Sequence, residues 1–131
     1  MDRYDRIIRD IQNRTEYESI RWRVASAERY SSVLLNPWHV LRAFTAGYPV
    51  AGRNYDLLFV EKKVTSEDPW GNLTDNHMCE LFILGADGQA VLSLYDGVVE
   101  RDDLLRLSGL IDAHNEGAKE FFEAFDESGA A

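Results

Sequence analysis

Two apolar runs separated by a turn signal constrain the fold more than any other feature of this sequence. Residues 78–84 (MCELFIL) and 89–95 (QAVLSLY) flank residues 85–88 (GADG). Two β-type runs around an Asp-Gly pair are typical of a β-hairpin, because these residues adopt the backbone angles of its tight turn. Residues 55–64 (YDLLFVEKKV) are apolar on both faces before they become charged, which predicts a central strand with an exposed end. The sequence therefore predicts an antiparallel sheet.

The segment before these strands begins with a helical pattern. Apolar side chains recur three, four and seven positions after Tyr4, which predicts a helix with one apolar stripe. Thr15 and Glu18 have the spacing of a capping box, which would open a second short helix. Residues 20–24 (IRWRV) alternate apolar and basic side chains, which favours a short strand. A helix that covers both segments is the alternative.

Residues 36–49 contain signals that begin and end a helix. Asn36 is a favourable N-cap and Pro37 suits the first helical position. Gly47 can end a helix in the left-handed conformation, and Pro49 prevents its resumption. These signals predict a helix of about ten residues. The aromatic side chains that its periodicity assigns to the core are Trp38, Phe44 and Tyr48.

The last third of the chain has a second helical pattern. Between residues 101 and 125, leucine, isoleucine and phenylalanine recur at three- and four-residue steps, which predicts a long helix whose apolar stripe packs on the sheet. A break near residues 115–117 is an open alternative, because glycine at position 117 weakens a helix. Residues 127–131 are expected to fray. Residues 65–76 (TSEDPWGNLTDN) are rich in turn formers and predict a loop.

Together these patterns predict an α+β fold in a single domain, residues 1–131, whose length suits one hydrophobic core. We expect an antiparallel sheet of three to five strands, packed by N-terminal helices and a long C-terminal helix. No apolar run has the length of a membrane span, and the charged start lacks the apolar run of a secretory signal. We therefore expect a cytoplasmic protein that does not enter a membrane.

Charge is distributed unevenly along the chain, whose formal net charge is −9. Residues 67–131 contain fifteen acidic and three basic side chains, against eight acidic and eleven basic ones in residues 1–66. If the acidic half keeps a contiguous face, that face attracts basic surfaces and repels nucleic acid. The simpler interpretation is that acidic side chains only confer solubility. Arginines and aromatic residues alternate near the N-terminus, but the overall acidity argues against a nucleic-acid partner.

Catalytic and metal-binding patterns are weak. The most concentrated set of chemically active side chains is Asp75, His77 and Cys79, to which His114 would have to be added by the fold. These four residues define a small enzyme or ligand-binding site as one hypothesis. Their spacing matches no recognised metal motif, and a single cysteine excludes both an internal disulfide and a CxxC-type zinc site. No phosphate-binding glycine motif occurs, so we expect no cofactor and no metal.

Trp70 differs from the other aromatic residues, because it lies in a polar segment with no periodic reason for burial. Tryptophan is enriched at binding hot spots, and acidic neighbours accelerate docking onto basic partners. The alternative is that Trp70 folds back over the sheet as a lid. The residues that we predict to bind a partner are Glu67, Asp68, Trp70, Asp75, Asp87 and Asp96; the two last precede glycine, as turns also require.

The outline of the chain, small and acidic with a hairpin leading to a last helix rich in leucine and phenylalanine, is similar to two groups of bacterial proteins. One is the immunity proteins that neutralise toxins, and the other is the chaperones of secretion systems. The resemblance contains no motif, so it assigns no residue a role. It implies a non-enzymatic protein that covers a basic site on a toxin or effector, with chaperone function as the alternative. A homodimer that pairs through the last helix is a further hypothesis.

Overall fold

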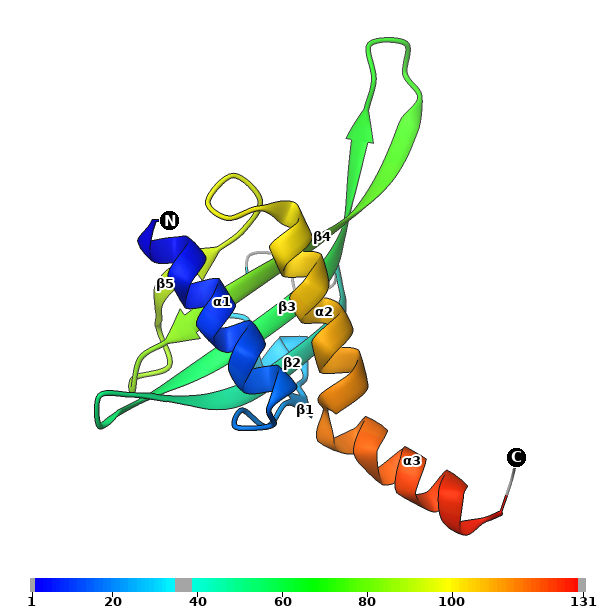
Figure 1. The fold of residues 1–131 in the computed structure, drawn as a ribbon. Coiled ribbons are helices and arrows are strands. Elements are labelled where there is room, and N and C mark those ends of the chain that lie inside the picture. The colour runs from blue at the N-terminus through cyan, green and yellow to red at the C-terminus, as the bar shows by residue number, and fades with distance from the viewer. Residues whose placement is uncertain (1, 35–38, 130–131) are drawn as a thin grey trace.

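The computed structural model describes residues 2–34 and 39–129. In chain order its elements are α1 (Arg3–Glu16), β1 (Arg23–Val24), the 3-10 helix η1 (Ala27–Tyr30), β2 (Val40–Val50), β3 (Arg53–Glu67), β4 (Leu73–Leu84), β5 (Ala90–Leu94), α2 (Arg101–His114) and α3 (Glu116–Glu127). The strands form one antiparallel sheet in the order β1-β2-β3-β4-β5 (Figure 1). The α+β prediction and the antiparallel sheet are therefore confirmed.

The two faces of the sheet are covered differently. Helices α1 and α2 pack side by side across one face (Figure 1), and the segment 25–34 covers the opposite face. Residues 57–60 of β3 lie between these two layers and are all buried, because successive side chains of a strand point to opposite faces. This confirms residues 55–64 as a central strand. The core under the helices includes Ile8, Ile11, Trp22, Phe59, Leu81, Leu104, Leu107 and Ile111.

The first helix is longer than the sequence suggested. Asp2 caps it by accepting a hydrogen bond from the backbone N–H of Asp5 at 2.8 Å. Thr15 lies inside α1, where its hydroxyl donates to the carbonyl of Ile11, so the second helix predicted from Thr15 and Glu18 does not form. Residues 23 and 24 then pair with β2, which confirms a short strand there.

The helix predicted for residues 36–49 is wrong from residue 40 onward. Residues 40–50 form β2, and Asn36, Pro37 and Trp38 lie outside the described residues. Phe44, Ala46 and Tyr48 are buried at every second position, which is the period of a strand and not of a helix. Pairing with β3 along almost the whole of β2 outweighs the local helix signals.

The C-terminal helical segment is broken at Asn115, as the open alternative allowed. Its backbone is extended (φ −70°, ψ 154°), its side-chain oxygen accepts from the N–H of Ala118 at 2.9 Å, and its side-chain nitrogen donates to the carbonyl of Ile111 at 2.8 Å. Asn115 therefore ends α2 and begins α3. The leucine and isoleucine part of the stripe packs on the sheet, but the phenylalanine part does not, because α3 projects away from it (Figure 1).

Within residues 2–34 and 39–129, no helix is both long enough and apolar enough to cross a membrane.

Candidate functional site

Strands β3 and β4 extend beyond the rest of the sheet as a two-stranded ribbon. β2 pairs with β3 as far as Lys62, and β5 pairs with β4 from Leu81 to Leu84. Beyond those limits residues 63–67 and 73–77 pair with each other. We call residues 63–77 the arm, and Figure 1 shows it projecting far from the sheet. The loop predicted for residues 65–76 is therefore wrong except at residues 68–72.

Polar contacts between its strands hold the arm together. The hydroxyl of Thr65 donates to Asp75 at 2.8 Å, and the ammonium of Lys63 lies 3.0 Å from the same carboxylate. The hydrogen bond from Thr65, followed by the contact with Lys63, lowers the pKa of Asp75. Asn76 donates to the hydroxyl of Ser66 at 3.3 Å. Such cross-strand pairs matter here, because a two-stranded ribbon alone is only marginally stable in water.

The loop at the end of the arm is organised by Asp68. Its backbone N–H donates to the carbonyl of Asn72, and one of its carboxylate oxygens accepts from the backbone N–H groups of Trp70 and Asn72, each at 2.9 Å. The side chain of Asn72 donates to the other oxygen at 3.0 Å. Gly71 has φ +82°, a left-handed conformation that favours glycine. Hydrogen bonds from Asn72 and Trp70 lower the pKa of Asp68, so the carboxylate that orders the loop stays ionised.

This ordered loop presents Trp70 to solvent. The side chain of Trp70 is 83% exposed, and Leu73, which opens β4 opposite Glu67, is 72% exposed. The lid alternative is therefore not adopted. The sequence pattern does not identify Leu73, because it predicts a single loop over residues 65–76. The signal that could have identified two strands is a strand-favouring threonine on each side of the turn formers, Thr65 before Pro69 and Thr74 after it.

The six residues predicted to bind a partner do not form one surface. Glu67, Asp68, Trp70 and Asp75 lie on the arm. Asp96 lies at the base of the arm, where it lines a shallow pocket with His77 and Cys79. Asp87 lies in the turn between β4 and β5, at the end of β4 opposite to the arm, where it accepts the N–H of Gln89 at 3.0 Å. The arm therefore gathers the tryptophan with three of the five predicted carboxylates.

The alternative enzyme site does not assemble. The pocket lined by His77 and Cys79, about 210 Å³ in volume, includes neither Asp75 nor His114. His114 lies 3.3 Å from Glu18 at the far end of α2. Burial raises the pKa of the Cys79 thiol to about 11, which leaves it a poor nucleophile. Among the residues that the structure describes, no group of three His, Cys, Asp or Glu side chains could hold a metal ion.

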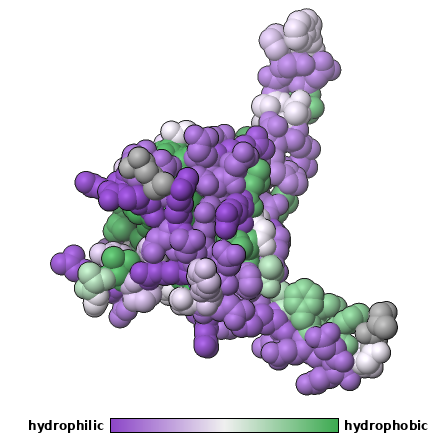
Figure 2. Space-filling model, viewed as in Figure 1, coloured by the Kyte–Doolittle hydropathy of each residue, from purple (hydrophilic) through white to green (hydrophobic). Residues whose placement is uncertain are grey.

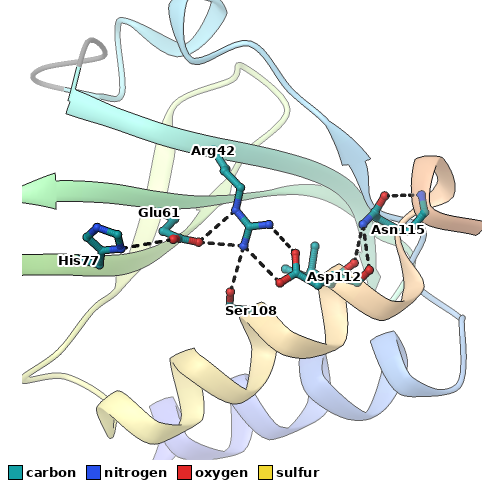
Figure 3. Close-up of polar contacts among 8 residues, drawn as sticks. Arg42, Glu61, His77, Ser108, Asp112 and Asn115 are labelled. Atoms are coloured by element: carbon teal, nitrogen blue, oxygen red, sulfur yellow. Dashed lines mark hydrogen bonds and ion pairs between the residues drawn. The ribbon is translucent and has the colours of Figure 1, made fainter. Parts of the chain in front are cut away.

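A polar network connects the base of the arm to α2 (Figure 3). Arg42 on β2 donates to Glu61 on β3 at 2.8 Å and lies 2.5 Å from Asp112 on α2. Its guanidinium also reaches Ser108, and His77 lies 3.8 Å from the other side of Glu61. Hydrogen bonding to Asp112 and Glu61 raises the pKa of Arg42 further above its already high value. The network connects α2 to the part of the sheet from which the arm extends.

Comparison with known proteins adds no functional assignment to this geometry. No protein-family model, no curated protein sequence and no solved structure matches the chain significantly.

Proposed function

We propose that this protein is a non-enzymatic binding protein of the immunity or inhibitor type, which neutralises a toxin or effector by placing the end of its arm in a basic site. The observation that carries the proposal is the exposure of Trp70 on a loop whose backbone N–H groups donate hydrogen bonds to Asp68. Tryptophan anchors are most effective when their conformation is fixed before binding, because less conformational entropy is lost. The single thiol suits a reducing cytoplasm.

The charge of the arm end favours a basic partner. Glu67 and Asp68 lie close to Trp70 in the chain. Lys63 is the one lysine or arginine of residues 63–77, and Asp75 engages it. A partner surface with lysine or arginine around an apolar pocket would complement this arrangement. Carboxylates at the rim of such an interface accelerate association, whereas an indole at its centre slows dissociation.

Site-specific crosslinking tests this proposal. A photoreactive phenylalanine analogue is introduced at position 70 in cells that express the protein, and at position 91 as the matched control. Val91 is also exposed, but it lies on β5, away from the arm. We expect a covalent adduct with one basic protein from position 70 and none from position 91. An absence of adducts at position 70, or the same adduct from both positions, would refute the proposal.

A further inference from the structure

The last helix has an aromatic face that the rest of the protein leaves uncovered. Phe121, Phe122 and Phe125 are 63%, 52% and 43% exposed, and none of the side chains of α3 is buried. The ring centroid of Phe121 lies 6.0 Å from that of Phe122 and 6.1 Å from that of Phe125, so the three rings form one patch. Figure 2 shows an apolar strip along one side of the projecting helix and hydrophilic residues along the other. We call these three residues the Phe face.

Contacts at the first turn of α3 attach the helix to the domain. The backbone N–H of Glu116 donates to the carbonyl of Trp22 at 2.9 Å, and Lys119 lies 3.2 Å from Glu18. A helix of this length is marginally stable in water without tertiary packing. Burying the Phe face would stabilise α3 through the large apolar area of its rings.

The charges of α3 restrict what can cover this face. The helix carries five carboxylates, Glu116, Glu120, Glu123, Asp126 and Glu127, and the one basic side chain, Lys119, faces Glu18. Pairing α3 with α3 of a second copy would bring two acidic helices together. A membrane surface with anionic lipids would likewise repel the acidic side of α3.

We propose that α3 is a docking helix, and that its Phe face binds an apolar groove of another protein whose rim carries lysine or arginine. A groove surrounds a helix, so it buries more of α3 than a flat surface does, and its basic rim complements the acidic side. This second binding site requires neither Trp70 nor the arm. It therefore stands or fails independently of the function proposed above.

The experiment uses a defined probe, a synthetic amphipathic helical peptide with leucine on one face and lysine on the other. An otherwise identical peptide of leucine and glutamate is the control. Binding to the full-length protein is followed by fluorescence polarisation and by NMR chemical shifts. We expect the leucine–lysine peptide to bind and to shift the resonances of the Phe face, with an affinity that falls as salt concentration rises. We expect the leucine–glutamate peptide to bind about tenfold more weakly or not at all.

Two variants separate this site from the arm. The triple variant Phe121→Ser, Phe122→Ser and Phe125→Ser should weaken peptide binding about tenfold or more, whereas Trp70→Ser should leave it unchanged. Circular dichroism should show an intact domain, because none of the three rings belongs to the core. An affinity for the leucine–lysine peptide that is unchanged in the triple variant would overturn the proposal, as would equal binding of both peptides. A dimer that sedimentation detects in the wild type but not in the triple variant would overturn the proposal in favour of a second copy. Binding to phosphatidylcholine–phosphatidylserine vesicles that the triple variant loses would overturn it in favour of a membrane surface.

Discussion

The backbone N–H of Trp70 donates a hydrogen bond of 2.9 Å to the carboxylate of Asp68, two residues earlier in the chain. The same carboxylate oxygen accepts from the N–H of Asn72. The most exposed aromatic side chain described in the protein is thus carried by a loop whose backbone is fixed by one acidic residue. Asp68 has a structural role in addition to its charge.

Replacing Asp68 should loosen the loop and leave the domain intact. Asp68→Ala removes the acceptor of three hydrogen bonds, so we expect larger amplitudes of motion for the backbone amide of Trp70 in ¹⁵N relaxation. The free energy of unfolding should change by less than about 0.5 kcal/mol, because the loop lies on the surface. Asp87→Ala, which removes one hydrogen bond in the turn before β5, is the control and should not affect Trp70. Unchanged relaxation at Trp70 in Asp68→Ala would show that the carboxylate does not order the loop.

The buried indole of Trp22 has its hydrogen-bond acceptor in Thr15. Its N–H donates to the hydroxyl of Thr15 at 2.9 Å, and both side chains are inaccessible to solvent. Thr15→Val keeps the shape of the side chain but leaves the indole N–H without an acceptor, so we expect a loss of about 1–3 kcal/mol in chemical denaturation. The matched variant Thr65→Val, on the exposed arm, should cost less than about 0.5 kcal/mol. Equal costs for the two variants would contradict this account.

Arg42 should contribute more to stability than an ordinary surface arginine. It connects β2 to Glu61 on β3 and to Asp112 on α2, although its side chain is partly exposed and its ion pairs are therefore screened by solvent. Arg42→Leu should cost about 1 kcal/mol in urea denaturation. Arg106→Leu removes a single exposed pair with Glu16 and should cost less than about 0.5 kcal/mol. A cost for Arg42→Leu no larger than that for Arg106→Leu would show that the network does not stabilise the packing of α2.

The thiol of Cys79 should be protected in the native state. Because burial raises its pKa to about 11, alkylation at pH 8 should be on the order of 100-fold slower than in the unfolded chain, whose thiol has an ordinary pKa. The unfolded thiol ionises first as the pH rises, so this group destabilises the native state above about pH 8.5. In Cys79→Ala the decline in stability above that pH should be smaller. Native alkylation as fast as that of the unfolded chain would contradict the buried position.

The sequence predicted β3 and the hairpin of β4 and β5 better than it predicted β2. Residues 57–60 and the hairpin around Gly85 were identifiable, because burial on both faces and turn chemistry leave strong local patterns. β2 was not, because Gly47 and Pro49 resemble the end of a helix, whereas pairing with β1 and β3 determines its conformation. The pattern within β2 does not report its pairing with the strands on either side.

The two projecting parts were misjudged for a related reason. The strands of the arm consist mostly of polar residues, which resemble a loop when no core-facing stripe is present. The phenylalanines of α3 continue the spacing of the core residues in α2, although the break at Asn115 turns them away from the sheet. Periodicity identifies an apolar face but not what that face packs against. For the candidate site, the sequence identified Trp70 and its neighbouring carboxylates but not the arm that presents them.

The most direct test of the central claim is a binding titration with the basic protein crosslinked at position 70, using the wild type, Trp70→Ser and Val91→Ser. The account predicts that Trp70→Ser weakens binding by about 30-fold or more, as expected of a hot-spot residue, and that Val91→Ser binds like the wild type. A Trp70→Ser protein that binds its partner as tightly as the wild type would contradict the account.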